Sequence, residues 1–439
     1  MNLRTTLLAF LCLCAATVLH AERVDMLKIG AKANGKVLNT KLINTTIDRL
    51  NRNGGGTLFF PAGTYLTGSI RLKSNITLEL EAGATLLFSD NFDDYLPFVE
   101  VRHEGVMMKS FQPLIYAVDA ENITIKGEGT LDGQGKKWWM EFFRVMIDLK
   151  DNGMHDLNKY QPMWDAENDT TAIYTETNKD YVSTLQRRFF RPPFIQPVRC
   201  KKVKIEGVKI VNSPFWTVNP EFCDNVTIKG ITIDNVPSPN TDGINPESCR
   251  NVHISDCHIS VGDDCITIKS GRDAQARRLG VPCENITITN CTMLSGHGGV
   301  VIGSEMSGSV RKVTISNCVF DGTERGIRIK STRGRGGVVE DIRVSNIVMS
   351  NIKQEAVVLN LKYSPMPAEP KSERTPIFRN VHISGMTVTD VKTPIKIVGL
   401  EEAPISDIVL RDIHIQGGKQ KCIFEDCERI TMDDVIVNG

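Results

Sequence analysis

The chain has 439 residues, and 52 Lys and Arg balance 52 Asp and Glu, so the formal net charge at pH 7 is zero. Hydrophobic residues make up 41% of the sequence, which supplies a large core and excludes a wholly disordered chain. The even charge balance disfavours a nucleic-acid-binding protein, because such proteins carry a basic excess or stripe.

The first predicted element is a cleaved signal peptide over residues 1–21. Arg4 supplies the basic start and an apolar run follows over residues 7–18. An uncleaved anchor is the alternative, but the run is shorter than a membrane span and no stop-transfer flank follows. Cys12 and Cys14 suggest a lipoprotein less strongly, because neither follows a small residue. We expect export to the periplasm or the extracellular space, and no membrane span.

A short amphipathic helix is predicted next. Ile43, Ile47 and Leu50 recur at helical spacing after Asn39, and the glycine run 54–56 stops the pattern. Such a helix would cover the open apolar end of a repeat array, as terminal repeats must.

From residue 200 onward one short sequence motif recurs, in which β-branched residues alternate with polar ones. Its anchors lie 22 to 39 residues apart, with earlier copies at Ile76 and Ile123. Short strands repeated at this length, without helical spacing between them, predict a solenoid. The grammar of leucine-rich repeats and propeller blades is absent from the sequence, so we predict an all-β fold, a single-stranded right-handed parallel β-helix. The anchors are Val203, Val226, Val252, Ile286, Val313, Ile342, Val381, Ile408 and Ile430.

The repeat also explains many cysteines and asparagines. Ten of the 12 cysteines follow the leader, and many occupy repeat positions, which predicts buried small hydrophobic side chains and leaves any disulfide pairing open. An asparagine often precedes the anchor, which predicts a stacked turn ladder rather than glycosylation. These residues are Asn75, Asn122, Asn225, Asn251, Asn285 and Asn380.

An insertion at about residues 133–197 interrupts the repeat. It is too long for a turn between coils, and long insertions of this kind are usually functional or disordered. Its aromatic content favours an ordered wall beside a functional site within one domain over residues 22–439. The aromatic residues are Trp138, Trp139, Tyr160, Trp164 and Tyr174.

Polar residues gather where four consecutive coils are aligned. The block 242–245 aligns with 264–267 and with 298–301, and 327–330 aligns with a shift of one residue. Neighbouring coils place side chains about 5 Å apart. Each polar residue alone has an ordinary explanation as turn chemistry or a solvated strand face, but together on one outer face they predict a site. Its residues are Asp242, Asp263, Asp264, His297, Arg328 and Lys330.

This set suits hydrolysis of a glycosidic bond beside an acidic sugar. Two carboxyl groups separated by ~6.5–9.5 Å would act as acid and base on either side of a water and invert the configuration. Clustered carboxylates raise one pKa, so that one group can donate a proton near neutral pH. Arg328 and Lys330 would pair with the substrate carboxylate, and His297 would hold the protonation pattern by hydrogen bonding.

Four motifs in this order resemble the signature blocks of the polygalacturonase family of glycoside hydrolases. They begin at Asn240, Gly262, Gly296 and Arg328, and the stretch from Ile29 to Thr85 also resembles the start of that family. The resemblance covers nearly all of the mature chain. It implies an inverting hydrolysis of α-1,4-galacturonosyl linkages in pectin by a right-handed parallel β-helix.

The same resemblance implies residue roles. Asp263 matches the general acid, and Asp242 and Asp264 match the carboxylates that activate water. His297 matches a supporting histidine, so the implied catalytic residues are Asp242, Asp263, Asp264 and His297. The implied substrate-binding residues are Asn240, Arg328, Lys330 and Tyr363. On a straight strand adjacent residues face oppositely, so we expect a bend at Gly262 beside Asp263 and Asp264.

The insertion at 133–197 distinguishes this sequence from the compact endo-acting members of the polygalacturonase family. A wall at one end of the groove would make the enzyme exo-acting, as in a bacterial galacturonosidase. The sequence leaves open exo or endo action and the choice among homogalacturonan, xylogalacturonan and rhamnogalacturonan.

Two rival functions remain. A pectate-lyase-like β-helix would cleave by β-elimination with Ca²⁺ held by carboxylates. A non-catalytic carbohydrate-binding or adhesin solenoid would bind without turnover. The sequence contains no His-Glu-x-x-His and no Gly-x-Ser-x-Gly. We expect a monomer that binds a pectic oligo- or polysaccharide, with no nucleic acid, no cofactor and no metal.

Overall fold

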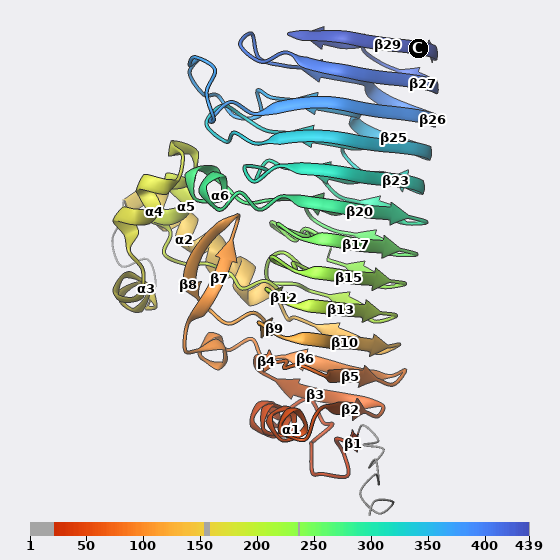
Figure 1. Ribbon diagram of the computed structural model, residues 1–439. Coiled ribbons are helices and arrows are strands. Elements are labelled where there is room, and N and C mark those ends of the chain that lie inside the picture. Colours follow the sequence, from red (N-terminus) through yellow and green to blue (C-terminus); the bar gives the residue numbers. More distant parts are fainter. Residues whose placement is uncertain (1–21, 153–158, 236–237, 439) are drawn as a thin grey trace, which may run out of the picture.

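The computed structural model describes residues 22–152, 159–235 and 238–438, so the expected leader at 1–21 lies outside the described residues. Within this part, 24 strands join one sheet whose pairings are parallel, and the chain climbs coil by coil from the N-terminal to the C-terminal end (Figure 1). The predicted right-handed parallel β-helix is confirmed.

The first row of strands carries the anchors and runs the full length of the stack. Its members are β1 (Glu22–Asp25), β2 (Gly56–Phe60), β5 (Ile76–Leu80), β10 (Glu121–Gly127), β13 (Lys201–Glu206), β15 (Asp224–Lys229), β17 (Arg250–Ser255), β20 (Cys283–Thr289), β23 (Val310–Asp321), β25 (Val338–Asn360), β26 (Ile377–Val398), β27 (Ile405–Gly418) and β29 (Cys427–Asn438). All nine anchors from Val203 to Ile430 pair with one another in register.

A second row lies directly after the first in each coil. It contains β3 (Gly63–Thr67), β6 (Ala84–Phe88), β11 (Thr130–Asp132), β14 (Lys209–Val211), β16 (Thr232–Asp234), β18 (His258–Ser260) and β21 (Thr292–Ser295). The later strands β23 and β25 continue this row without a break.

The third row consists of short strands and single bridges. It contains β4 (Ile70–Arg71), β9 (Ile115–Val118), β12 (Ile195–Val198), β19 (Ile266–Ile268), β22 (Val300–Ile302), β24 (Ile327–Lys330) and β28 (Ile423–Glu425). Bridges connect Ile195 to Val218, Val218 to Ile244, and Ile244 to Ile266. This row carries the predicted site.

The register of this row corrects one detail of the predicted alignment. Ile244 pairs with Ile266 and Ile266 with Val300, as expected. Val300 pairs with Ile327, however, so the fourth block is shifted by two residues rather than one.

The predicted capping helix is α1 (Thr40–Arg52), and it lies at the N-terminal end of the stack (Figure 1). Its side chains at Ile43, Ile47 and Leu50 are fully buried. A Cβ at Gly56 would lie 2.8 Å from Leu50 Cδ2, so the helix approaches β2 closely where there is no side chain.

The repeat positions behave as predicted. All ten described cysteines are free thiols, and eight of them are buried. The six asparagines before the anchors have positive φ angles between 51° and 62°, the left-handed region that asparagine tolerates. Amide hydrogen bonds join two pairs of them, from Asn122 Nδ2 to Asn75 Oδ1 at 3.0 Å and from Asn285 Nδ2 to Asn251 Oδ1 at 3.2 Å.

The insertion is ordered and largely helical in its described part. It contains α2 (Lys136–Asn152), α3 (Gln161–Glu167), α4 (Thr170–Glu176), the 3₁₀ turn η2 (Lys179–Tyr181) and α5 (Val182–Gln186). Figure 1 places these helices beside the stack, near the antiparallel hairpin of β7 (Val99–His103) and β8 (Val106–Ser110) and helix α6 (Asp273–Leu279). Trp138 is fully buried against Phe92, of the 3₁₀ turn η1 (Phe92–Tyr95), and Phe111.

The expected bend at Gly262 is present. Residues 261–265 form a turn between β18 and β19 rather than a straight strand. A Cβ on Gly262 would overlap the carbonyl oxygen of Ser238, so the close approach of the preceding coil requires glycine here. No helix in the described ranges is long and apolar enough to cross a membrane.

Candidate active site

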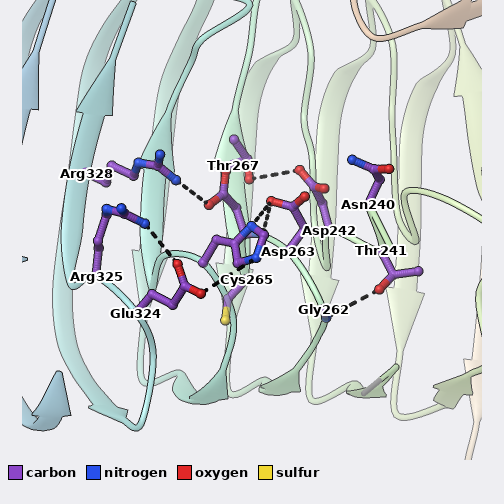
Figure 2. A network of polar contacts seen from close by, with 12 residues as sticks. Asn240, Thr241, Asp242, Gly262, Asp263, Cys265, Thr267, Glu324, Arg325 and Arg328 are labelled. Carbon is purple, nitrogen blue, oxygen red and sulfur yellow. Dashed lines mark hydrogen bonds and ion pairs between the residues drawn. The ribbon is translucent and has the colours of Figure 1, made fainter. Parts of the chain in front are cut away.

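A pocket of about 260 Å³ opens over the third row of strands. Six predicted residues line it, namely Asn240, Asp242, Asp263, Asp264, Lys330 and Tyr363. His297 and Arg328 are not among the lining residues, but each contacts a lining carboxylate. The structure therefore brings all eight predicted site residues into one connected group, part of which is drawn in Figure 2.

The three carboxylates lie closer together than the sequence analysis predicts. Asp242, Asp263 and Asp264 each offer an oxygen, and these oxygens all lie within 4.8 Å of one another. The expected gap of ~6.5–9.5 Å between an acid and a base is therefore wrong for this trio. The turn after Gly262 brings the two neighbouring aspartates toward Asp242 on the previous coil instead of placing them on opposite faces.

Asp264 is held in its ionised form. Lys330 Nζ lies 2.7 Å from Asp264 Oδ2, and Arg328 Nη1 lies 3.2 Å from Asp264 Oδ1. Burial alone would raise the pKa of Asp264, but the two cations outweigh it and lower this pKa to about 2. This carboxylate can accept a proton from water or hold an electrostatic partner, but it cannot supply a proton near neutral pH.

Asp242 has the opposite environment. Its side chain is buried, it accepts a hydrogen bond from Asn245 Nδ2 at 3.0 Å, and the cation nearest to it, Lys269 Nζ, is 3.9 Å away. Burial and the charge of Asp263 raise the pKa of Asp242 well above its usual value. Asp242 therefore keeps a proton to a higher pH than an exposed aspartate does.

Asp263 is the most accessible of the three. Its side chain is 18% exposed, compared with 4% for Asp242 and 1% for Asp264. His297 Nδ1 lies 3.0 Å from Asp263 Oδ1, and His297 Nε2 lies 3.9 Å from Glu324. The hydrogen bond with Asp263 raises the pKa of His297, although burial opposes the shift. This hydrogen bond fixes Oδ1 of Asp263, whose side chain also lines the pocket.

Arg328 and Lys330, the two predicted substrate-binding cations, are less exposed than side chains on the outer face of a strand usually are. The side chains of Arg328 and Lys330 are only 11% and 8% exposed, because both reach inward to Asp264. Their outer neighbour is Tyr363, whose ring lies 5.6 Å from Arg328 and 5.2 Å from Lys330 and is 43% exposed. The predicted outer face is thus the floor of a pocket.

Asn240 is positioned by the insertion. Arg191 donates from Nη2 to Asn240 Oδ1 at 2.8 Å and from Nη1 to the carbonyl oxygen of Pro239 at 2.7 Å. None of the described residues of 133–197 lines the pocket, whereas Glu104 at the tip of the β7–β8 hairpin does. The wall expected from the insertion is supplied directly by the hairpin.

Several pocket residues escaped the sequence analysis. Lys269 and Arg272 both contact Glu305, which lies on the next coil, and Trp216 lies beneath Lys269. One signal was available, because Lys269 interrupts the apolar strand after Ile266 and Ile268 immediately downstream of the aspartate pair. The contact of Glu104 with Arg272, by contrast, joins segments far apart in the sequence.

Two groups in the described residues have the geometry to hold a cation. One is the carboxylate trio, although Asp264 already has two cationic partners. The other lies on β27 and β29 and is exposed, and it contains Asp412, His414 and Asp434.

Comparison with known proteins places this architecture in a family. Residues 179–435 match the model of glycosyl hydrolases family 28. A probable polygalacturonase of Vitis vinifera is 30% identical over 407 residues, which cover 90% of this chain and 74% of that protein. An exo-poly-alpha-D-galacturonosidase of Dickeya chrysanthemi is 28% identical over 359 residues, covering 78% of this chain and 57% of that protein.

A solved structure gives the same answer. The hyperthermoactive exopolygalacturonase of Thermotoga maritima superimposes with a TM-score of 0.80 at 36% identity, covering 94% of this chain and 92% of that one. The fold, the order of the motifs and the matched length agree: the chain belongs to family 28 of the glycosyl hydrolases.

Proposed function

We propose that the protein is an inverting, exo-acting polygalacturonase that hydrolyses α-1,4-galacturonosyl linkages in pectin. The observation that carries the proposal is the carboxylate trio, in which two cations lower the pKa of Asp264 to about 2 while burial raises the pKa of Asp242. Hydrolysis of a glycosidic bond needs one acid and one base beside the same bond. The exopolygalacturonase from Thermotoga maritima and the galacturonosidase from Dickeya chrysanthemi support the substrate and the mode of action.

Asp263 is the group to donate the proton. It is the most exposed member of the trio, and His297 orients it through a contact of 3.0 Å between Nδ1 and Asp263 Oδ1. Asp264 and Asp242 lie deeper, where both would hold the attacking water and Asp264 would accept its proton. Asp263 gives its proton to the leaving oxygen while Asp264 accepts one from the attacking water, so the number of protons on the trio is unchanged by the step.

Acidic sugars would be recognised by the cations at the pocket floor. Lys330 and Arg328 carry two charges against the single charge of Asp264, so the group attracts a further carboxylate. Tyr363 offers an exposed ring beside them for the apolar face of a sugar.

The exo mode follows from closure at one end. Glu104 at the hairpin tip lines the pocket and contacts Arg272, and Arg191 holds Asn240 on the coil before Asp264. A long chain cannot pass this wall, so only a terminal sugar fits beyond the cleaved bond.

A digest of polygalacturonic acid in the presence of a chelator tests the activity. We expect saturated monomer as the only early product, measured as reducing ends and by size. Mixed oligomers at early times would contradict exo action. An ultraviolet-absorbing product that the chelator abolishes would establish the lyase instead. Binding without turnover on galacturonan, xylogalacturonan and rhamnogalacturonan fragments would favour the adhesin-like solenoid.

The Asp263→Asn substitution tests the acid. We expect turnover to fall by about 10²- to 10⁴-fold, the usual contribution of a general acid. The thermal midpoint is the control, because a folded variant with unchanged turnover would contradict the assignment of Asp263.

The stereochemistry needs its own measurement, because the carboxylate spacing does not settle it. Proton NMR of the first turnover should show the β-anomer of galacturonate before mutarotation. An α-anomer as the first product would contradict inversion.

Export and a monomeric state are part of the proposal. The residues before Glu22 have the composition of a leader. Intact mass after expression in a secreting host should give a chain that begins near Glu22, and size-exclusion chromatography with light scattering should give the mass of one chain. A retained leader or a larger assembly would contradict these two points.

A further inference from the structure

The last part of the insertion carries a buried arginine, Arg191, between α5 and β12. The residue is 2% exposed, and its guanidinium lies 4.0 Å from the ring centroid of Phe142 and 5.1 Å from that of Phe215. Within the described ranges, its hydrogen bonds all go to neutral oxygen atoms. A buried cation without a hydrogen-bonded carboxylate is costly, and departures of this kind are expected where function requires them.

The acids that act on this cation belong to the pocket. Burial lowers the pKa of Arg191 to about 9, and the charge of Arg187 acts in the same direction. The charges of Glu104, Asp263 and Asp242 oppose the shift, so the guanidinium stays charged at neutral pH. All three acids line the pocket. Arg191 is therefore linked to the active site by charge, although it does not line the pocket itself.

Arg191 also joins two coils at the turn that leads into Asp242. Its Nη1 donates to the carbonyl oxygen of Pro214 at 2.9 Å and to that of Pro239, on the next coil, at 2.7 Å. Its Nη2 donates to Asn240 Oδ1 at 2.8 Å. Asn240 has a φ of 52°, so the backbone is in the left-handed conformation two residues before the aspartate. The planar guanidinium holds these acceptors in a fixed geometry and thereby places the turn.

The same contact determines which end of the Asn240 amide faces the pocket. A guanidinium can only donate, so the atom that it meets is the amide oxygen. Asn240 lines the pocket, and Figure 2 shows its nitrogen on the side of Asp242 and its oxygen on the other side. In the described part of the chain this nitrogen has no acceptor in the protein. Asn240 therefore offers a hydrogen-bond donor to a ligand.

We propose that Arg191 is a positioning residue for the hydrolysis, which fixes the turn carrying Asp242 and holds the amide nitrogen of Asn240 toward the substrate. The inference rests on the proposed function and deepens it. The insertion then acts on the chemical step through Arg191, although none of its described residues lines the pocket.

Kinetics on trigalacturonate test the proposal. Asn240→Ala should lower kcat/KM about 10-fold, as for loss of one hydrogen bond. Arg191→Lys keeps the charge but cannot form the fork, and it should lower kcat/KM about 100-fold, which is the cost of misplacing a catalytic group by about 1 Å. Most of this second loss should be in kcat, because the variant leaves Arg328 and Lys330 at the pocket floor unchanged.

The double variant Arg191→Lys/Asn240→Ala shows whether Arg191 acts through the amide. Independent effects would multiply to a loss of about 1,000-fold. We expect a loss of only about 100-fold, because an amide that is no longer held in place has little left to contribute. A loss equal to the product of the two single losses would overturn the proposal.

Asn240→Asp tests the orientation of the amide. The aspartate can still accept from Arg191, but it presents an acceptor to the pocket in place of a donor. We expect a loss at least as large as that of Asn240→Ala. Retained activity would show that the substrate meets the oxygen of Asn240, and it would overturn the proposal.

Arg188→Gln is the matched control for a general loosening of the insertion. Arg188 lies 2.7 Å from Asp165 and 5.0 Å from the ring of Trp164. This variant should leave kcat unchanged, and a fall as large as that in Arg191→Lys would contradict a specific role for Arg191. If Arg191→Lys fails to fold by circular dichroism, the comparison of Asn240→Asp with Asn240→Ala carries the test.

Failure of the proposed function gives a different result. No hydrolysis of trigalacturonate by the unmodified protein would contradict the function, and calorimetry with the same trisaccharide would then decide the orientation of Asn240. Binding weakened alike by Asn240→Ala and Asn240→Asp would support it, and unchanged binding would overturn it. Absence of both hydrolysis and binding would overturn the function and the inference together.

Discussion

Asp242 and Asp264 occupy equivalent positions on adjacent coils, yet their surroundings move their pKa values in opposite directions. Asp264 has two cations within hydrogen-bonding distance, whereas Asp242 has an amide and a more distant lysine. Because their pKa values shift in opposite directions, the two carboxyl groups contribute to the stability of the fold at different pH, although both serve one reaction.

Asp242→Asn should stabilise the protein at neutral pH while removing most activity. The folded-state pKa of Asp242 lies above the unfolded value, so its contribution to stability is present at low pH and is lost as pH rises through the folded-state pKa. The gain in thermal midpoint over the unmodified protein should therefore appear near pH 7 and vanish near pH 3. A lower midpoint at pH 7 would contradict this environment.

Asp264→Asn should have the opposite effect on stability. Its folded-state pKa is about 2, below the usual 3.8, so its contribution is present above pH 3.8 and is lost as pH falls toward 2. The substitution leaves Lys330 and Arg328 without their partner, which should cost roughly 3–5 kcal/mol at pH 7. Urea unfolding measures the loss, and an unchanged midpoint would refute the ion-pair assignment.

At the scale of the element, a buried arginine of the β7–β8 hairpin, Arg102, binds the hairpin to the stack of coils. Arg102 lies 3.2 Å from Glu221 and 3.4 Å from Glu247, and all three side chains are at most 1% exposed. Burial and the charge of Glu247 raise the pKa of Glu221 well above its usual value. Glu221, Glu247 and Lys269 occupy the same position on three successive coils. This one row of positions therefore holds the hairpin, through Arg102, and also provides Lys269 to the pocket.

Arg102→Met should destabilise the protein by roughly 3–5 kcal/mol, because it leaves two buried carboxyl groups uncompensated. Activity should fall as well, since Glu104 and Gly105 at the hairpin tip would lose their position against Arg272. Adding Glu221→Gln should restore part of the stability by removing one of the two acids. Urea unfolding of the three variants tests this, and additive losses would contradict the coupling.

At the scale of the whole molecule, each coil contacts chiefly its two neighbours, so stability should be distributed along the axis. Ile47→Ala in α1 removes a fully buried side chain and should cost about 2–5 kcal/mol locally. Hydrogen exchange should quicken in β2 and β5 but not in β27. Ile413→Ala, which empties an equally buried position in β27, is the matched control and should quicken exchange only at the other end. Uniform acceleration along the stack would show one cooperative unit instead.

Much of the architecture can be predicted from the sequence, because it depends on the spacing of apolar residues along the chain. Val203 and its successors repeat at a spacing that only stacked strands satisfy, and each asparagine before an anchor sits in the left-handed conformation its small amide tolerates. Ile43, Ile47 and Leu50 marked the cap by helical spacing alone. The residues of the motifs, from Asn240 to Lys330, also came from order along the chain.

The tertiary structure decided what depends on contacts between distant coils. The short separation of Asp242 from Asp263 and Asp264 follows from the turn at Gly262, where only glycine fits beside the carbonyl oxygen of Ser238. The wall is formed by Glu104, a residue outside the insertion that the sequence indicated. Lys269 belongs to the site because its ammonium group contacts Glu305 on the next coil and lies over the ring of Trp216. Period fixes which residues face inward, whereas pKa values and pocket walls depend on distances between side chains of different coils, which no local pattern encodes.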